Sequence, residues 1–541
     1  MARNVRADTV VYQIYPRSYM DSNGDGIGDL RGIISKLDYI ASLGVNTIWL
    51  SPVYQSPDED NGYDISDYKT IQPHFGTMED FEELVREARA RGIDIIMDLV
   101  INHTSDEHEW FRRALAGEEK YKNYYIISKG KNGKKPNNWG NFFAECPWTE
   151  FSENGEYYLH LFSKKQPDLN WHNPDVMAEI QDIMHFWLGK GVKGFRCDVI
   201  NVIYKNSLKN GRPRLILAGR EHYMSAEGCH SIIRTLREKC LEPYGAWAVG
   251  ETVFVTVPQA RKLCEEERKE LDMVFYFEHM ECDQIAVKWF KTRLSLKKLM
   301  RTLTKWQTGL SWNAVYFENH DQPRFINRFC DSAAYREKAS QMMAGLAMTL
   351  RGTPFVYEGQ EIGMTNGSFR SLADMRDVES RNVEATAKRL ALPKRARWRI
   401  IELTSRDNAR TPMQWTAGEN AGFSTAEPWL RVNPNHKFIN AENELGREDG
   451  VLAFWKKMIS LRKKLPALCH GKFVPVCESG SVYAYMRVYG KEKLLAVMNM
   501  SAKETPLPKE ARICGTLVAS NYGKREKMLK PFEFRLVRVK Q

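Results

Sequence analysis

The sequence predicts an α/β protein built on a (β/α)8 TIM barrel. Short runs of β-branched and aromatic residues recur eight times, and stretches with helical spacing of apolar residues separate several of them. Polar residues directly follow several of these runs, as they do where the parallel strands of a barrel end. Eight such units close a barrel, and 541 residues leave room for additions. We therefore expect a barrel with a subdomain inserted after strand three and a C-terminal antiparallel β domain.

The expected strands of the barrel share β-branched, aromatic and other apolar residues between turn or helix signals. They are Val10–Tyr15, Val45–Leu50, Ile93–Leu99, Lys193–Val199, Trp247–Glu251, Leu271–Phe275, Ala314–Glu318 and Thr353–Tyr357. Apolar residues at helical spacing predict helices between some of these strands. The clearest are Leu30–Leu43, Met78–Arg91 and Val176–Lys190.

Two stretches interrupt the alternation of strands and helices. Residues 104–171 lose periodicity and are rich in Trp, Asn, Gly and Lys, so we expect an inserted subdomain there. A second irregular insertion is expected over about 363–440, and the barrel itself then occupies 1–103 and 172–469. From about residue 470, alternating apolar runs replace helical signals, which predicts a small antiparallel β domain over 470–541.

Composition argues against several classes of protein. The formal net charge is +11, but Lys and Arg are interspersed with Asp and Glu, so we expect no nucleic-acid partner. No run of about eighteen apolar residues and no signal-like start are present, and the ten cysteines show neither a CxxC pair nor zinc spacing. These features predict a cytoplasmic enzyme without a membrane partner or organic cofactor, as a monomer or weak homo-oligomer.

The turn-rich segment after the first strand resembles the front half of a calcium-binding loop. Oxygen-bearing side chains occupy positions 1, 3, 5 and 9, with glycine at position 6. Gly32 stands where an EF-hand would place its glutamate, so an EF-hand is not expected. The loop could instead satisfy its own backbone through Asx turns. We expect a structural calcium ion, with Asp21, Asn23, Asp25, the Ile27 carbonyl and Asp29 as candidate ligands.

The fourth strand carries the central motif of the sequence, Gly194–Val199. Residues i and i+2 of a strand share a face, so Arg196 and Asp198 lie side by side. The cation is expected to lower the pKa of Asp198, although a structural ion pair would look the same in sequence. Other strands also end in polar residues that a barrel brings to one face. These are Asp98, His103, Glu251, His320 and Asp321.

This set could bind a metal or catalyse acid–base chemistry. The acids lack the ligand spacing of i, i+3 or i, i+4, and Arg196 would compete with a metal beside Asp198. A nucleophile and an acid explain the set better: ionised Asp198 attacks, and Glu251, whose pKa is raised by burial or by a nearby acid, donates a proton. Glycoside cleavage uses such a pair of carboxyl groups.

Four motifs, in order, make the sequence resemble the α-amylase family of glycoside hydrolases. They are Asp98–His103, Gly194–Asp198, Val249–Glu251 and Phe317–Asp321, and a fifth, Gln166–Trp171, ends the inserted segment. The resemblance covers essentially the whole chain. It implies a retaining double displacement in which Asp198 is the nucleophile, Glu251 the acid/base and Asp321 the third acid, which binds sugar hydroxyls.

The resemblance also implies a closed sugar-binding pocket. Tyr63 is expected under the sugar and Asp64 on its terminal hydroxyls. Further expected substrate contacts are His103, Gln166, Arg196, Val199 and His320. The segment Arg406–Trp415 resembles a signature of exo-acting members, in which Arg406, or alternatively Arg410, pairs with Asp64 and blocks the pocket behind the first glucose.

Within the family, the sequence most resembles the oligo-1,6-glucosidase and dextran glucosidase branch. Val199, directly after the nucleophile, is typical of this α-1,6 group. The branch implies an exo-acting α-glucosidase that hydrolyses α-1,6-linked glucose from isomalto-oligosaccharides. The segment Tyr204–Gly245, including Asn210–Leu215 and Arg220–Tyr223, departs from the pattern. Alternatives are a trehalose-6-phosphate hydrolase, an α-1,4-preferring α-glucosidase and a sucrose isomerase. A non-catalytic binding protein on this scaffold would typically lack the three acids that this chain retains.

Overall fold

The computed structural model describes residues 4–131, 133–143, 145–214, 216–285, 287–330, 332–524 and 526–540. Eight parallel strands form its central sheet, in the order β11-β10-β9-β5-β2-β1-β15-β14, and β11 lies against β14, so that the sheet closes into a barrel. The predicted fold class is confirmed. The strands are β1 Val11–Ile14, β2 Thr47–Leu50, β5 Asp94–Leu99, β9 Gly194–Cys197, β10 Trp247–Glu251, β11 Met273–Phe275, β14 Ala314–Val315 and β15 Thr353–Tyr357.

The register of the barrel strands places the central arginine beside an acid. Arg196 on β9 is paired in register with Asp98 on β5 and with Val249 on β10. Asp198 and Glu251 therefore come from neighbouring strands at the same edge of the barrel. Apart from the half-buried Asp94 at the start of β5, the strands are buried along their length, which accounts for the near-continuous apolar runs in the sequence.

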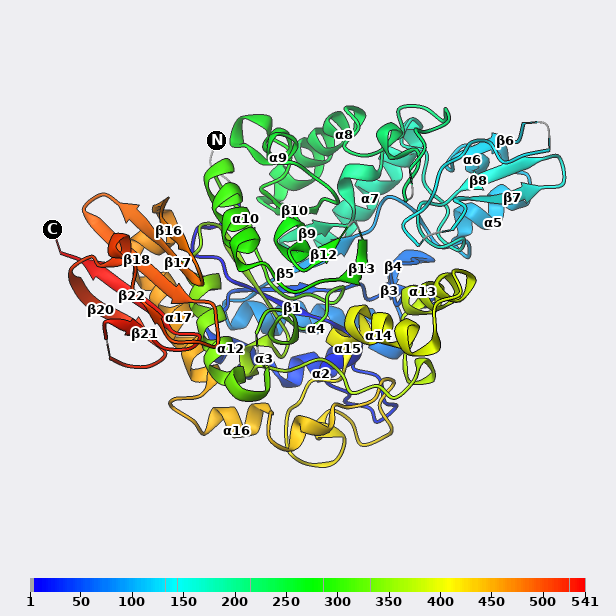
Figure 1. Ribbon diagram of the computed structural model, residues 1–541. Helices are drawn as coiled ribbons and strands as arrows, with labels where there is room; N and C mark the ends of the chain where they lie inside the picture. Colours follow the sequence, from blue (N-terminus) through cyan, green and yellow to red (C-terminus); the bar gives the residue numbers. More distant parts are fainter. Residues whose placement is uncertain are drawn as a thin grey trace.

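Helices cover the outside of the barrel (Figure 1). The predicted helix Leu30–Leu43 is two helices, because Lys36, at φ −108° and ψ 5°, interrupts it. Among the described residues, no helix is long and apolar enough to cross a membrane. The helices of this part of the fold are α1 Pro16–Tyr19, α2 Leu30–Ser35, α3 Leu37–Leu43, α4 Met78–Ala90, α7 Pro174–Gly189, α8 Gly228–Leu236, α9 Val257–Cys264, α10 Leu296–Gly309, α11 Phe325–Phe329, α12 Ser332–Thr349, α17 Val451–Lys464 and α18 Pro466–His470.

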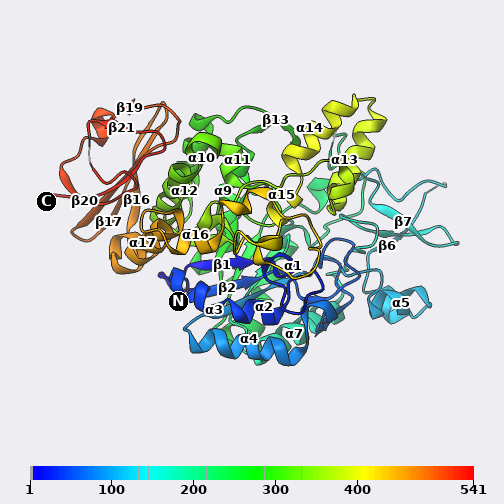
Figure 2. The same ribbon diagram turned by 90° about the horizontal axis from the view of Figure 1, so that it is seen from below.

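The segment after β5 contains its own small sheet, in the order β6-β8-β7. Its elements are α5 Glu109–Leu115, α6 Glu119–Lys122, β6 Ile127–Lys129, β7 Trp148–Ser152 and β8 Glu156–Leu159, all within the predicted range 104–171. A buried ion pair ties the segment to the barrel: Lys205 Nζ lies 2.6 Å from Asp168 Oδ2 and donates to Asn102 Oδ1 at 2.8 Å. Figures 1 and 2 place this segment at the end of the molecule opposite the C-terminal sheet.

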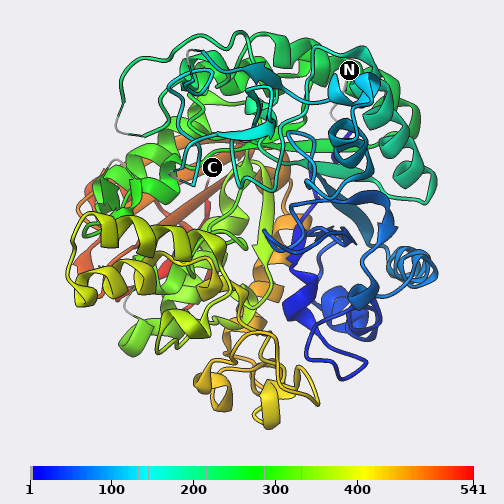
Figure 3. The same ribbon diagram turned by 90° about the vertical axis from the view of Figure 1, so that its right-hand side faces the viewer.

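The second insertion is less irregular than the sequence indicates. It holds two helices, α13 Val378–Arg389 and α14 Lys394–Thr404, followed by the short helices α15 Asp407–Arg410 and α16 Ala441–Leu445. Two-stranded sheets add to the same region of the fold, namely β3 Tyr54–Gln55 with β4 Asp67–Ile71 and β12 Gln284–Ile285 with β13 Val287–Lys291. Figures 2 and 3 show α13 and α14 side by side in yellow, and α14 packs against β13.

The C-terminal domain is a five-stranded antiparallel sheet, as predicted, in the order β16-β17-β18-β22-β20. Its strands are β16 Lys472–Ser479, β17 Val482–Tyr489, β18 Glu492–Asn499, β20 Gly515–Ser520 and β22 Phe534–Val539, with β19 Thr505–Pro506 and β21 Met528–Leu529 beside it. One hydrophobic core joins this sheet to the barrel helices, including Leu346, Tyr485 and Phe534. A Cβ on Gly345 of α12 would lie 2.4 Å from the Phe534 ring.

Candidate active site

A pocket of about 980 Å³ lies at the ends of the barrel strands. Asp198 and Asp321, which follow β9 and β14, and Glu251, which ends β10, all line it, so the three predicted catalytic acids share one cavity. Tyr63, His103, Val199 and Arg406 line the same cavity. The other predicted substrate residues, Asp64, Gln166, Arg196 and His320, are buried behind its wall.

One guanidinium group binds three carboxylates at the base of the site. Arg196 Nη1 lies 2.5 Å from both Asp98 Oδ1 and Asp198 Oδ1, and its Nη2 lies 2.8 Å from Glu251 Oε2. All four side chains are buried. Arg196 thus fixes Asp198 and Glu251 relative to each other, and Asp98 in turn accepts a hydrogen bond from Trp49 Nε1 at 2.8 Å.

The direction of the Asp198 pKa shift corrects the prediction from sequence. Burial raises the pKa of Asp198 to about 6, and the Arg196 cation only partly offsets this. The cation is less effective than expected because Asp98 and Glu251 share it. At neutral pH Asp198 is still ionised, as a nucleophile requires.

Glu251 has the higher pKa of the two groups, as predicted. Burial, and then the neighbouring Asp198 and Asp321 charges, raise the pKa of Glu251 to about 7, while Arg196 acts in the opposite direction. The backbone N–H of Val199 donates to Glu251 Oε2 at 3.1 Å and orients the carboxyl group. A carboxyl group with this pKa holds a proton near neutral pH and can donate it.

Asp321 is kept ionised by two arginines and by the buried His320 ring beside it. Burial alone would raise its pKa, but His320, Arg406 and Arg410 hold the pKa of Asp321 well below its ordinary value. His320 Nε2 lies 3.0 Å from Asp321 Oδ2, and Arg410 Nη2 lies 3.1 Å from Oδ1. The Tyr63 and His320 rings are stacked, with centroids 5.3 Å apart. The Tyr63 hydroxyl oxygen lies 2.7 Å from His320 Nε2.

The predicted pairing of Arg406 with Asp64 is wrong; the partner is Asp60. Arg406 Nη2 lies 2.9 Å from Asp60 Oδ1 and 2.7 Å from Asp377 Oδ1. Asp60 also lines the pocket, whereas Asp64 is fully buried and accepts backbone N–H groups of Glu59 and Asp60 at 2.9 and 3.0 Å. Asp64 therefore closes a local turn, and that turn presents Asp60 to the cavity.

Sequence reasoning missed Asp60 and Asp377 as members of the site. Asp60 lies in the acidic run Asp58–Glu59–Asp60, and nothing in its spacing sets it apart from its neighbours. Asp377 is the N-cap of α13 in the second insertion, where its side chain accepts from the Glu379 backbone N–H. In the sequence, an aspartate before a helix is explained by N-capping alone. Nothing in the sequence therefore indicated that Asp377 contacts Arg406.

His103 and Gln166 form a buried layer beside the pocket. Gln166 Nε2 donates to Asp60 Oδ2 at 3.4 Å and to the Tyr63 carbonyl at 3.2 Å, and His103 Nε2 lies 3.1 Å from that same carbonyl. Burial lowers the pKa of His103, which favours the neutral ring. Gln166 thus acts on the pocket through Asp60 and Tyr63.

The calcium-type loop lies away from the pocket and is held by its own hydrogen bonds. Asp21 accepts from backbone N–H groups of the loop and from Ser424 Oγ at 2.6 Å. Asn23 and Asp25 each accept from the N–H two residues further on, and Asp29 caps α2. These hydrogen bonds are those expected of a loop that satisfies its own backbone through Asx turns, the alternative to a metal site.

The donor set of the loop nevertheless fits a hard cation, because it consists only of oxygen atoms. Among the described residues, no three Asp, Glu, His or Cys side chains are grouped so that they could hold a metal ion. Calcium at this loop would therefore need the Asn23 amide and the Ile27 carbonyl as well as carboxylates.

Comparisons with known proteins agree with this geometry. Residues 13–471 match the family model described as alpha amylase, catalytic domain. An oligo-1,6-glucosidase of Bacillus cereus is 48% identical over 511 residues, covering 92% of this chain and 91% of that protein. An oligo-1,6-glucosidase of Parageobacillus thermoglucosidasius is 45% identical over 555 residues, covering 98% of each. The crystal structure of Bacillus licheniformis trehalose-6-phosphate hydrolase matches with a TM-score of 0.93 at 41% identity, covering 99% of each chain.

Proposed function

Since the chain belongs to the α-amylase family of glycoside hydrolases, we propose that it is an exo-acting oligo-1,6-glucosidase that releases α-1,6-linked glucose from the non-reducing end of isomalto-oligosaccharides. The observation that carries the exo-acting part is the buried contact of Arg406 with Asp60 and Asp377. These side chains join the second insertion to the turn after β3 and close one end of the pocket. A closed end accommodates a terminal sugar and excludes the interior of a polymer.

The site supports a double displacement. A carboxylate oxygen of Asp198 attacks C1 of the terminal glucose, while Glu251 gives its proton to the glycosidic oxygen and the remaining sugar leaves. Glu251, now ionised, takes a proton from water, which attacks the same carbon and releases Asp198. One guanidinium bridges both carboxylates, and this supports the short carboxyl separation of retaining enzymes over the wider one of inverting enzymes.

Two cations at the pocket wall have carboxylate partners, whereas Arg220 lies over the Phe254 ring, so the preference for a neutral substrate rests on the names of the relatives. Arg214 Nε lies 3.6 Å from Glu221, and Lys288 forms an ion pair with Glu379. A trehalose-6-phosphate hydrolase would need cations available to a phosphate group. Val199 and the names of the relatives support the α-1,6 linkage.

The substrate can be tested by incubating the protein separately with isomaltose, maltose, trehalose-6-phosphate and sucrose and measuring the glucose released. We expect far faster release from isomaltose than from maltose. Turnover of only the phosphorylated sugar would overturn the proposal, and conversion of sucrose to an isomer would assign a sucrose isomerase. The Asp198→Asn protein, purified in parallel, controls for contaminating glucosidases.

The mechanism has a separate test. Asp198→Asn is expected to lower kcat by at least about 10³-fold because the amide is a poor nucleophile, with an unchanged circular dichroism spectrum. Proton NMR of the first product should show the α anomer of glucose. The β anomer, or substantial residual turnover by the variant, would exclude Asp198 as the nucleophile.

We also propose that the loop Asp21–Asp29 takes one structural calcium ion. Its oxygen-only donor set and spacing support this. Added calcium should raise the melting temperature of chelator-treated protein, whereas Asp21→Asn, Asp25→Asn protein should not respond. An equal response of both proteins would place calcium elsewhere.

We further propose that the protein acts in the cytoplasm as a monomer or weak homo-oligomer. All ten cysteines are free, which supports a reducing compartment. Light scattering of the purified protein over a range of concentrations tests the oligomeric state.

A further inference from the structure

Phe254 adopts a backbone conformation that aromatic residues seldom occupy. It lies three residues after Glu251, at φ 52°, in the left-handed region that favours glycine. The ring is 43% exposed and lines the pocket. Exposure of so large an apolar ring offers little burial to offset the cost of this backbone, so its function is the better explanation.

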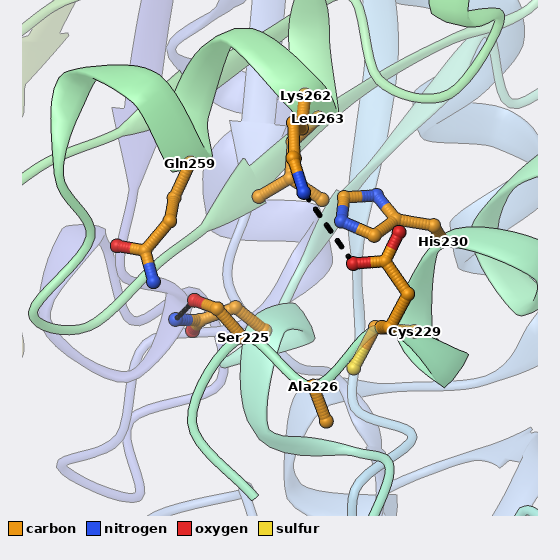
Figure 4. A pocket seen from close by; sticks show the side chains of 9 residues that line it. Ser225, Ala226, Cys229, His230, Gln259, Lys262 and Leu263 are labelled. Carbon is orange, nitrogen blue, oxygen red and sulfur yellow. Dashed lines mark hydrogen bonds and ion pairs between the residues drawn. The ribbon is translucent and has the colours of Figure 1, made fainter. Parts of the chain in front are cut away.

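The backbone of Phe254 is held from behind by Asn201. The Asn201 side chain donates to the Val253 carbonyl at 2.9 Å and accepts from the Val253 N–H at 3.1 Å, which fixes the preceding residue at both ends. Asn201 also donates to Ser225 Oγ at 3.1 Å. A second pocket, of about 120 Å³, lies beside this clamp and is lined by Asn201 itself, with Gln259 on one side and His230 on the other (Figure 4).

The strain is repeated around the pocket. Val199 and Leu217, at φ 35° and 49°, also have left-handed backbones and also line it. Val199 is the residue whose N–H orients Glu251, and Asn201 lies two residues further on, in the short helix Ile200–Val202. The turn after the nucleophile therefore positions both the acid and the Phe254 loop.

One face of the Phe254 ring is covered by a cation, and the residue lines the same pocket as the acid Glu251. The Arg220 guanidinium lies over the ring, 5.6 Å from its centroid. Phe290, 51% exposed on β13, lines the same pocket. Because the acid/base faces the departing sugar, a ring in the same pocket and three residues after Glu251 is placed to meet that sugar.

We propose that Phe254 is a stacking platform for the departing part of an isomalto-oligosaccharide, backed by Arg220 and held by the Asn201 clamp. The open face of the ring meets the C–H groups of the sugar, and the residue thereby sets the preference for oligosaccharides with a full acceptor portion. This inference rests on the proposed function.

The test compares Phe254→Gly and Phe254→Tyr with the wild-type protein on isomaltotriose and on α-glucosyl fluoride, whose leaving group has no sugar. The ratio of kcat/KM for isomaltotriose to kcat/KM for the fluoride should fall about five- to tenfold in Phe254→Gly and recover in Phe254→Tyr. Glycine relieves the backbone strain, so the melting temperature should stay the same or rise. Phe438→Gly, which removes a ring 80% exposed outside the pocket, is the matched control and should leave the ratio unchanged.

If Phe254→Gly left the ratio of the two kcat/KM values unchanged, because neither value fell or both fell equally, the proposed stacking role of Phe254 would be overturned. If the glycine variant fails to fold, Phe254→Asn, which tolerates the left-handed region, takes its place. Failure of the proposed function is distinguishable, because wild-type protein would then cleave the fluoride but not isomaltose.

Discussion

Two side chains of the site share one cation and differ in proton affinity. Arg196 contacts both Asp198 and Glu251, yet burial leaves their pKa values at about 6 and about 7. The two groups titrate as a coupled pair whose active form has one proton, on Glu251.

This pair predicts a narrow pH optimum. Asp198 must be ionised, so kcat/KM should fall as pH drops through about 6, and Glu251 must be protonated, so kcat/KM should fall as pH rises through about 7. The measurement is kcat/KM for isomaltose from about pH 4 to about pH 9. With α-glucosyl fluoride as substrate, the Glu251→Gln protein should still lose kcat/KM as pH drops through about 6 but should no longer lose it as pH rises through about 7. If kcat/KM of that variant still fell at high pH, a group other than Glu251 would cause the fall.

The correction from Asp64 to Asp60 predicts that two neighbouring acids behave differently. Asp60→Asn removes a charged partner of Arg406 from the pocket and should raise KM about 10- to 100-fold. Asp64→Asn removes one of two acceptors of backbone N–H groups and should lower the free energy of unfolding by about 1–2 kcal/mol with little change in KM. Initial-rate kinetics and urea unfolding of both variants test this. A larger KM effect from Asp64→Asn would reverse the assignment.

The catalytic acids were predictable from sequence because each follows a recognisable strand. The resemblance also implied a closed end blocked by Arg406, but the partners of Arg406 were not predictable, since Asp60 and Asp377 lie in a turn and at a helix cap and only the three-dimensional arrangement brings them to Arg406. The expectation that the pKa of Asp198 is lowered was wrong for a similar reason. The sequence shows the adjacent cation but neither the depth of burial nor the two other acids that share Arg196.

At the level of helices and strands, α12 ends against a buried arginine. Arg462 on α17 donates to the carbonyls of Met348 and Leu350 at 2.9 and 3.1 Å and also to that of Gly352. These carbonyls lie at or just beyond the end of α12, where helical partners are lacking and the helix dipole is negative.

Arg462→Met should therefore lower the free energy of unfolding by about 3 kcal/mol, because buried carbonyls lose their donors. Arg538→Met is the control: that side chain is 52% exposed and, in the described part of the chain, forms an ion pair with Glu492, so the change should stay below about 1 kcal/mol. Urea unfolding measures both. Equal decreases in the free energy of unfolding of the two variants would show that the contacts of Arg462 with the carbonyls do not stabilise the protein.

Sequence patterns predicted elements best where burial is continuous. β10 and β15 match their predicted bounds, whereas the predicted strand Ala314–Glu318 is paired only over Ala314–Val315. Its last three residues lead toward Asp321 and leave the ladder. The break at Lys36 and the helices α13 and α14 were missed because apolar spacing alone does not mark a change of direction.

At the scale of the whole molecule, the barrel and the C-terminal sheet share one hydrophobic core, so we expect them to unfold together. Gly345→Ala places a Cβ against the Phe534 ring and should cost about 1–3 kcal/mol. Gly189→Ala, at the end of α7 with no atom within 4 Å of the new Cβ, should be neutral or stabilising. Melting followed by circular dichroism and by residual activity should coincide in each variant. Separate transitions would show that the domains are independent.

The Arg406–Asp60 contact joins residues 346 positions apart. During synthesis, the nucleophile and the acid leave the ribosome while the second insertion has not yet been made. Residues of α17 and of the C-terminal sheet share the barrel's hydrophobic core and are made later still. The contact behind the first glucose therefore cannot form until Arg406 has been made, well after both catalytic carboxyls.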